Sequence, residues 1–340
     1  MRTALVVPTL AVTAILLSAC DEAPEGARDA GSIVRVYTSV DETFARQILD
    51  EYSRRSGVVV ETVFDSEAGK TTGLVQRIRV EKDRPAADVF WSGEVFNTLL
   101  LARDGLLAPH AGASDDVLPE RFRGADGRWR AVGLRARVLA FDPKRTSEEE
   151  LPTSMAELAK PEIASRLAIA NPLFGTTHGQ VAALVALWGE AKTREYLSTL
   201  RANGVRIVDG NSAAVREVIS GAAKFGLTDT DDVWAAQKTG ASLDLRYIDL
   251  GDGGTLLIPT SVGVVAGCPH PEVARKLADF LASADVERML YESDSRNIPV
   301  REGLRRELGA ELPPQTQVPY EHIAEHMGTA AQLVRETLLR

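Results

Sequence analysis

The order of apolar and polar positions predicts strands alternating with helices from about residue 32 onward. Runs rich in β-branched residues, such as 33–37 and 58–64, are typical of strands. Between these two runs, apolar residues recur at helical spacing over about 42–55, and Gly57 supplies a helix stop. Further strands are predicted at 87–91, 133–141, 167–170, 205–208, 222–227, 256–259 and 262–266, with helices between them. This alternation predicts an α/β protein with doubly wound, mixed sheets flanked by helices.

The densest group of acids follows the strand predicted at 222–227. Asp229, Asp231 and Asp232 come directly after it, before apolar residues resume at helical spacing with Val233. That order predicts a strand, a tight acidic turn and the first turn of a helix. In an α/β sheet, ligands bind at the turn after the carboxyl end of a strand. The three carboxylates therefore either cap the helix or coordinate a cation, and both interpretations stay open.

Two more acids occupy the same kind of position in the first half of the chain. Asp41 follows the strand at 33–37, and Glu94 follows the strand at 87–91. If two α/β units face each other across a cleft, these side chains converge with the acidic turn. Like charges ~4 Å apart repel by roughly 1 kcal/mol even in water, so such a group needs a cation or protonation. Hard cations prefer oxygen ligands, although Asp41 would also serve as a helix cap.

Basic, hydroxyl and amide side chains near other strand ends are candidates for an anion site. Arg135 and Arg137 alternate onto one face of a predicted strand, and Thr176, Thr177 and Asn211 lie in or beside turns that open helices. Guanidinium groups and helix N-termini are natural anion sites. The alternative is that the arginines pair with surface acids and the threonines form turns. A pocket with both signs of charge would suit a metal held with a synergistic anion, or a zwitterion.

The first twenty residues have the organisation of a bacterial lipoprotein signal peptide. Arg2 precedes an apolar segment too short for a stable membrane span, and residues 17–20 read Leu-Ser-Ala-Cys. This string resembles a lipobox, which implies a signal peptide at 1–19, a lipid on Cys20 and a polar tether over 20–31. The alternative is an ordinary secretory signal with a chance cysteine. We therefore expect a periplasmic or otherwise extracytoplasmic protein, anchored to the membrane by its lipid.

Composition excludes some classes of function. The net charge of −9 becomes −10 when residues 1–19 are removed, because that segment holds one arginine and no acid. An acidic protein binds nucleic acid poorly, since phosphate contacts need a basic face. If Cys20 carries a lipid, Cys268 is the only remaining thiol, so no internal disulfide is expected.

One catalytic motif needs an explanation. Residues 322–326 read His-Ile-Ala-Glu-His, which fits the H-x-x-E-H pattern of inverted zincins. No third ligand or substrate groove is evident, so a solvated helix face is the simpler interpretation. The sequence contains no G-x-S-x-G, Walker loop or dinucleotide fingerprint. An enzyme is therefore not expected, and an extracytoplasmic hydrolase is kept as a distant alternative.

Several strings, taken in order, resemble bacterial extracellular solute-binding proteins of ATP-driven (ABC) importers, in particular their ferric-iron-binding branch. They are 36–39 (VYTS), 87–91 (ADVFW), 104–109 (DGLLAP), 135–137 (RAR), the segment 211–232, and 277–281 (LADFL). The resemblance implies a type II periplasmic-binding-protein fold and a monomer that delivers its ligand to an ABC permease in the inner membrane. The expected N-lobe is 32–135 plus about 255–292, and the expected C-lobe is about 136–254 plus about 293–340.

The resemblance also assigns site residues. Glu94 falls where the family places a carboxylate iron ligand, and Asp41 falls near its histidine ligand. The residues that fall near those holding a synergistic anion are Arg135, Thr176, Thr177 and Asn211. Members that bind ferric iron carry adjacent tyrosines where this chain has Asp231 and Asp232. Carboxylates also suit Ca²⁺, Mn²⁺ or an ammonium group, so the ligand does not follow from the fold.

The leading hypothesis is a binding protein for a metal ion, with Fe(III) favoured, and with no catalytic cofactor. The expected metal ligands are Asp41, Glu94, Asp231 and Asp232. Tyr37 and Asp229 are further candidates for contact with the ligand. The alternative is a cationic or zwitterionic organic solute, such as an aminophosphonate.

Overall fold

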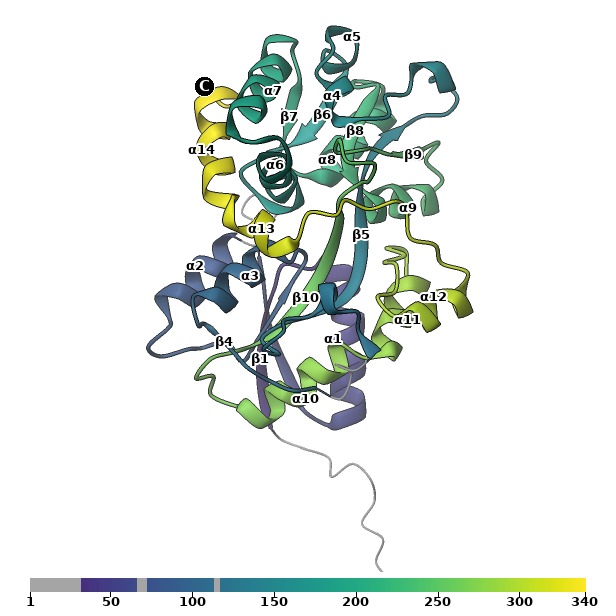
Figure 1. The fold of residues 1–340 in the computed structure, drawn as a ribbon. Helices are drawn as coiled ribbons and strands as arrows, with labels where there is room; N and C mark the ends of the chain where they lie inside the picture. Colours follow the sequence, from purple (N-terminus) through teal and green to yellow (C-terminus); the bar gives the residue numbers. More distant parts are fainter. Residues whose placement is uncertain (1–31, 66–71, 113–116) are drawn as a thin grey trace, which may run out of the picture.

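The computed structural model describes residues 32–65, 72–112 and 117–340 (Figure 1). The predicted signal peptide at 1–19, Cys20 and the tether at 20–31 lie outside the described residues. None of the described helices has both the length and the apolar character that crossing a membrane requires.

Within the described residues, ten strands form one mixed sheet in the order β2-β1-β3-β10-β5-β8-β6-β7, with β4 beside β10 and β9 beside β5. The strands are β1 Ile33–Thr38, β2 Val59–Phe64, β3 Val89–Ser92, β4 Leu107–Ala108, β5 Arg130–Phe141, β6 Leu167–Ala170, β7 Arg206–Val208, β8 Phe225–Asp229, β9 Asp244–Tyr247 and β10 Leu257–Val265. We call β1–β4 and β10 with their helices the first half, and β6–β9 with theirs the second half. The α/β class with mixed sheets is confirmed.

Helices cover both halves of the sheet (Figure 1). They are α1 Glu42–Ser56, α2 Thr72–Val80, α3 Phe96–Arg103, α4 Met155–Leu158, α5 Pro161–Ala164, α6 Gly175–Trp188, α7 Glu190–Ala202, α8 Asn211–Ser220, α9 Thr230–Lys238, α10 Pro271–Leu281, α11 Ala284–Glu292, α12 Glu302–Leu308, α13 Tyr320–Glu325 and α14 Met327–Thr337. In the first half, α1 packs with α10 and α11, and α2 packs with α3. In the second half, α6, α7 and α14 pack together, and α8 lies against β6 and β8. One large apolar cluster lies in the first half, and a second fills the other half and extends to α3 and the start of β10.

The strand β5 joins the two halves. Residues 130–136 of β5 pair with β10, and residues 137–141 pair with β8 and β9. At the change of partner, the Arg137 N–H donates to the Leu256 carbonyl at 2.9 Å, and the Thr255 hydroxyl donates to the Arg137 carbonyl at 2.7 Å. Thr255 also pairs with residues 314–316, which return the chain to the second half. The segments that cross between the halves are thus bonded to one another around Arg137.

Some predicted boundaries were wrong for physical reasons. The strand predicted from residue 133 begins at Arg130, and the two strands predicted within 256–266 form the single strand β10. Helix α6 begins at Gly175, whose φ of 55° allows a tight turn directly before Thr176. The C-terminal helices pack through buried Ile323 and Leu333 against the rest of the protein.

Gly179 on α6 lies directly against the ring of Phe96 on α3, so the two halves meet here without room for a side chain. Phe96 also approaches Tyr320 on α13, with 6.3 Å between the ring centroids. A Cβ at position 179 would overlap the Phe96 ring. We expect Gly179→Ala to lower the free energy of unfolding by about 1–3 kcal/mol, because overpacking displaces buried side chains.

Urea denaturation would measure this change, with Gly328→Ala as the matched control. Gly328 lies in α14, and a Cβ there would meet no atom within 4 Å. The control is expected to raise stability by about 0.5–1 kcal/mol through helix propensity alone. Equal effects of the two substitutions would contradict the packing argument.

His178 on α6 makes the stability of the C-terminal helices depend on pH. Its Nε2–H donates to the Met327 carbonyl at 2.9 Å, and burial lowers the pKa of His178. Below the ordinary histidine pKa of about 6.5, the unfolded chain takes up a proton that the folded chain resists. Stability should therefore fall as the pH drops from about 7 to about 5, and His178→Gln should lose less over that interval. Thermal unfolding of both proteins at the two pH values measures the difference, and parallel curves would refute it.

Candidate ligand-binding site

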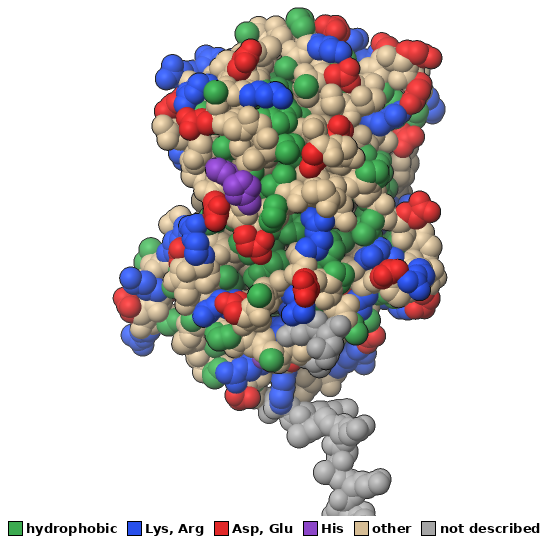
Figure 2. Space-filling model, in the orientation of Figure 1, with side chains coloured by type: hydrophobic (Ala, Val, Ile, Leu, Met, Phe, Trp, Pro, Cys, Tyr) green, Lys and Arg blue, Asp and Glu red, His purple; other side chains and the backbone are tan. Residues whose placement is uncertain are grey.

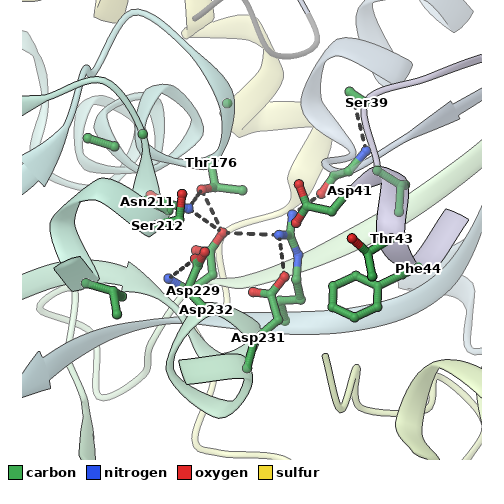
Figure 3. A pocket seen from close by; sticks show the side chains of 18 of the residues that line it. Ser39, Asp41, Thr43, Phe44, Thr176, Asn211, Ser212, Asp229, Asp231 and Asp232 are labelled. Carbon is green, nitrogen blue, oxygen red and sulfur yellow. Dashed lines mark hydrogen bonds and ion pairs between the residues drawn. The ribbon is translucent and has the colours of Figure 1, made fainter. Parts of the chain in front are cut away.

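A cavity of about 640 Å³ lies where the two halves face each other (Figure 3). From the first half, it is lined by the turn after β1 and by Gly93 and Glu94 after β3. From the second half, it is lined by the N-terminal ends of α6, α8 and α9. Arg135 of β5 lies between the two sets. The cavity is thus built from strand ends and helix starts, as the sequence pattern predicts.

The lining has a large excess of acid. Its described charged side chains are two arginines, Arg135 and Arg216, and eight acids, Asp41, Glu42, Glu94, Asp209, Asp229, Asp231, Asp232 and Asp294. On the outer face seen in Figure 2, by contrast, acidic and basic side chains are interspersed. The cavity therefore favours a ligand that brings positive charge.

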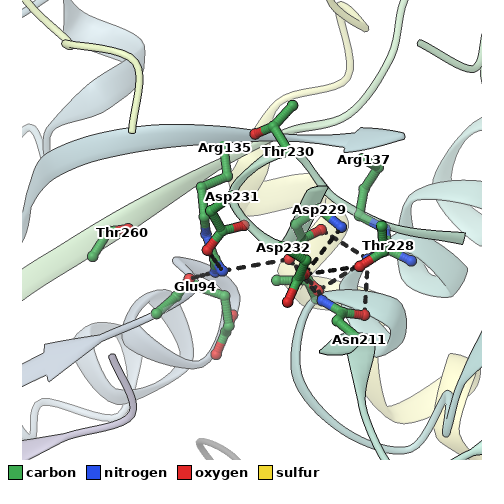
Figure 4. A network of polar contacts seen from close by, with 12 residues as sticks. Glu94, Arg135, Arg137, Asn211, Thr228, Asp229, Thr230, Asp231, Asp232 and Thr260 are labelled. Carbon is green, nitrogen blue, oxygen red and sulfur yellow. Dashed lines mark hydrogen bonds and ion pairs between the residues drawn. The ribbon is translucent and has the colours of Figure 1, made fainter. Parts of the chain in front are cut away.

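Asp229, the last residue of β8, is enclosed by donors (Figure 4). Arg137 Nη1 donates to Oδ1 at 2.7 Å, and Thr176 Oγ1 and Asn211 Nδ2 donate to Oδ2 at 2.8 and 2.9 Å. Arg135 Nη1 lies 3.5 Å from Oδ2. Burial raises the pKa of Asp229, but the charges of Arg137 and Arg135 outweigh it and hold the pKa below its ordinary value. Asp229 is therefore a stable carboxylate.

Arg137 is fully buried behind the cavity and does not line it. Besides Asp229, its guanidinium donates to Gln180 Oε1 at 3.0 Å, to Thr176 and Asn211, and to Thr177 Oγ1 at 3.3 Å. The register of the sheet explains the pairing, because Arg137 on β5 lies directly opposite Asp229 on β8. Arg137 thus holds α6, α8 and the end of β8 together.

Asp231 and Arg135 form the ion pair at the centre of the cavity (Figure 4). Asp231 Oδ2 accepts from Arg135 Nη1 at 3.0 Å, and Arg135 Nη2 donates to the Gly93 carbonyl. Asp231 is 5% exposed, and its Oδ1 is buried with no hydrogen-bond partner. Burial raises the pKa of Asp231; Arg135 opposes this rise, whereas Asp229 and Asp41 add to it. The carboxylate of Asp231 is therefore short of positive partners.

Asp232 takes part in capping α9 and also belongs to the group of three neighbouring acids. Its Oδ2 accepts from the Thr228 hydroxyl at 2.8 Å and from the Asp229 N–H at 3.4 Å, which completes a capping box at α9. Burial raises its pKa well above the ordinary value, and the charges of Asp231, Asp229 and Asp41 add to the rise. One carboxylate oxygen from each of Asp229, Asp231 and Asp232 lies within 4.8 Å of the others.

The two acids of the first half differ in whether their side chains cap a helix. Glu94 Oε2 accepts from the N–H groups of Phe96 and Asn97 at 2.6 and 3.1 Å, and Oε1 accepts from Asn97 Nδ2 at 2.9 Å. Glu94 therefore caps α3, and burial raises its pKa. Asp41 precedes α1 without a side-chain capping bond, and its carboxylate points into the cavity (Figure 3). Of these two acids, it is thus Glu94, rather than Asp41, whose side chain caps a helix.

Tyr37 is not brought to the cavity, contrary to its candidate role. It is fully buried, its hydroxyl donates to Glu81 at 3.0 Å, and the Arg77 guanidinium lies over its ring. Burial and the Glu81 carboxylate raise the pKa of Tyr37 to about 12. Successive residues of a strand point to opposite faces, and Tyr37 points away from the turn that carries Asp41.

Several lining residues were not predicted from the sequence, among them Ser39, Thr43, Asp294 and Asn297. Ser39 lies in the turn after β1, so the rule that located Asp41 would also have found it. Its hydroxyl accepts from the Gly93 N–H at 3.0 Å and ties the two loops together. Asp294 and Asn297 follow α11 rather than a strand, and nothing in their local sequence marks them.

The H-x-x-E-H motif lies away from the cavity. His322 and His326 lie on or directly after α13, with 4.8 Å between the centroids of their rings, and histidine side chains are exposed at the waist of the molecule (Figure 2). Among the described residues, the one group of three or more potential metal ligands is Asp229, Asp231 and Asp232. The motif therefore gathers no third ligand.

The sequence pattern of the family described as "Bacterial extracellular solute-binding protein" matches residues 34–293. The chain belongs to this family. Two curated relatives of this solute-binding protein are each 27% identical to it. "Iron uptake protein A1" of Synechocystis aligns over 84% of this chain and 82% of its own length. "Major ferric iron-binding protein" of Neisseria meningitidis aligns over 76% and 78%.

Solved structures share the fold. A ferric binding protein from Campylobacter jejuni has a TM-score of 0.80 at 18% identity, covering 89% of this chain and 99% of its own. The periplasmic binding protein AfuA from Actinobacillus pleuropneumoniae, with fructose-6-phosphate bound, has a TM-score of 0.78 at 16% identity, covering 91% and 99%. The predicted two-lobe periplasmic-binding-protein fold is thus confirmed for this solute-binding protein.

Proposed function

We propose that this protein is the substrate-binding component of an ABC importer and captures a metal ion, ferric iron first, in the cavity between its halves. The observation that carries the proposal is the buried Asp231 carboxylate, which lines an acid-rich cavity and has one oxygen without a hydrogen-bond partner among the described residues. A buried polar atom without a partner is costly, and a cation would satisfy it. The names of the curated relatives support iron as the cargo.

Asp41, Asp231 and Asp232 would be the protein ligands. Asp41 reaches the cavity from the first half and the other two from α9, so a cation between them would draw the halves together. A ligand that contacts both halves favours the closed arrangement, which is the form that a permease would recognise. Glu94 would have to give up its bonds to α3 before it could join them.

A thermal-shift screen tests the proposal. Fe(III), Mn²⁺ and Ca²⁺ are each added to the metal-free protein, alongside an aminophosphonate and simple amines. A ligand that binds only the folded protein at about 100 times its dissociation constant adds about 2.7 kcal/mol of stability. A rise with Fe(III) supports iron as the cargo. A shift with an amine and with none of the metals would refute the metal proposal.

A second candidate is a cationic or zwitterionic organic solute such as an aminophosphonate. Arg135 favours it, because this guanidinium already lies among the acids that a metal would need, with its Nε buried and unpartnered. The acids would hold an amine and Arg135 an anionic group. The structural relative with a bound sugar phosphate is an instance of an organic ligand in this fold. The same screen separates the two candidates.

The remaining features of the proposal concern location and assembly. We propose a periplasmic protein tethered by a lipid on Cys20, which mass spectrometry of the N-terminal peptide of the mature protein would test. The protein would act as a monomer whose two lobes close as rigid units. One lobe would comprise 32–135 plus about 255–292, and the other about 136–254 plus about 293–340. The partner would be an inner-membrane permease, and the role is binding rather than catalysis.

A further inference from the structure

Asp229 lies where three helices begin. Thr176 is in the first turn of α6, Asn211 is the first residue of α8, and Asp229 is the N-cap of α9. Helix N-termini carry partial positive charge and unpaired N–H groups, so they attract anions. Figures 3 and 4 show the Asp229 carboxylate pointing at Asn211 and its neighbours. The anion at this meeting point is therefore one of the chain's own side chains.

The donors around Asp229 are already used. Thr176 Oγ1 and Asn211 Nδ2 donate to Asp229 Oδ2 at 2.8 and 2.9 Å, and Arg137 donates to Oδ1 at 2.7 Å. The other N–H groups of Arg137 reach further protein acceptors, Gln180 among them. An external anion could therefore bind the side chains of Arg137, Thr176 and Asn211 only by displacing Asp229. These bonds argue against the expectation that Thr176 and Asn211 hold an external anion.

Asp231, two residues further along, is in the opposite situation. Its Oδ1 is buried without a hydrogen-bond partner, and its Oδ2 has Arg135 as its one ion-pair partner among the described residues. A buried carboxylate oxygen with no donor needs a cation or a proton. The two neighbouring acids therefore differ. Asp229 fills a cage of donors formed by Arg137, Thr176 and Asn211, whereas Asp231 lines the cavity and keeps one oxygen without a hydrogen-bond partner among the described residues.

We infer that Asp229 is a built-in counter-anion, and that the cavity takes its cation, a metal ion or an ammonium group, without an accompanying external anion. The identity of the ligand as a cation rests on the proposed function. The role of Asp229 does not rest on the proposed function, because the donors around Asp229 can be tested without any metal.

The first test uses the wild-type protein and no metal. Melting temperatures are compared in formate, bicarbonate, phosphate and chloride at equal ionic strength. An anion that binds an open site stabilises the folded protein by mass action and raises its melting temperature. If Asp229 already fills the site, the anion does not bind there and has no such effect. We expect no saturable rise with any of these anions, apart from the gradual stabilisation that phosphate gives to folded proteins in general. A saturable rise with formate, bicarbonate or phosphate over chloride overturns the inference.

The second test opens the cage. Asp229→Ala removes the carboxylate and leaves Arg137, Thr176 and Asn211 facing a space that formate can enter. Formate should raise the melting temperature of this variant relative to chloride, and it should not do so for the matched variant Asp294→Ala, whose exposed carboxylate also lines the cavity. If Asp229→Ala is unfolded in chloride, formate is expected to restore its circular dichroism. The inference is overturned if saturating formate neither raises the melting temperature of Asp229→Ala nor restores its circular-dichroism signal.

The third test measures metal affinity. Fe(III), Mn²⁺ or Ca²⁺ is titrated with and without bicarbonate or phosphate, with the same chelator in both arms. An anion that supplied one interaction of about 1.4 kcal/mol would change the affinity about tenfold, and we expect a smaller change. A tenfold or larger gain from the anion contradicts a built-in counter-anion. Absence of metal binding in both arms counts against the proposed function, and the formate experiments still decide the role of Asp229.

Discussion

Replacement of Arg137 by methionine is expected to lower the free energy of unfolding by about 3–5 kcal/mol. The substitution leaves the fully buried Asp229 carboxylate without its closest positive partner, which lies 2.7 Å away in the wild type. It also removes the donors to Gln180 and Thr177, which fix the start of α6. Chemical denaturation of the ligand-free protein measures the loss.

Two comparisons isolate the buried charge as the cause. Arg246→Met removes an ion pair with Glu148, which is 71% exposed, and should change stability by less than about 1 kcal/mol. The double variant Arg137→Met with Asp229→Asn leaves no unpaired charge, so it should be less destabilised than the sum of the single variants. Additive losses would mean that Arg137 acts through packing rather than through its charge.

Replacement of Asp231 by alanine is expected to reduce affinity for the cation by at least about 100-fold while the protein stays folded. Changes to groups that only support a metal ligand already reduce metal affinity about 10- to 100-fold, so loss of a direct ligand should reach or exceed that range. The melting temperature of the ligand-free protein should change little, because the neighbouring acids already disfavour this carboxylate and Asp229 still lies 3.5 Å from the Arg135 guanidinium. Binding isotherms and thermal unfolding of the same preparation provide both readouts.

Asp294→Ala is the matched control for Asp231→Ala. Asp294 also lines the cavity, but its side chain is 58% exposed and its ion pair with Lys238 is long, at 3.9 Å. Water already solvates such a carboxylate, so its loss should change the affinity by less than about tenfold. Equal losses for the two variants would show that the total charge of the cavity, rather than Asp231 itself, determines binding.

The sequence predicted where the site is better than it predicted what each residue does. Asp41 and Asp231 follow strands, and position after a strand is a local property that apolar periodicity reveals. The partner of Asp229 depends on sheet register, since Arg137 faces it only because β5 and β8 pair in that alignment. No local pattern encodes that pairing.

The same distinction explains the two residues whose roles differ most from expectation. Glu94 lies just after a strand end, as predicted, but only Val95 separates it from α3, so the helix N–H groups lie within reach of its carboxylate. Tyr37 lies in a strand that leads to the cavity, but its side chain lies on the other face of the sheet. A shift of one residue changes the face, because successive residues of a strand point to opposite faces. Position after a strand therefore indicates which residues lie near the cavity, whereas their hydrogen-bond partners are known only from the three-dimensional structure.

The position of β10 has a consequence for how the chain reaches its native state. β10 lies between β3 and β5, yet it begins at Leu257, long after β3 ends at Ser92. The sheet of the first half therefore cannot close until most of the chain is available, and pairing between such distant segments slows folding. A truncated chain that ended before Leu257 would therefore leave β3 and β5 without the strand that joins them.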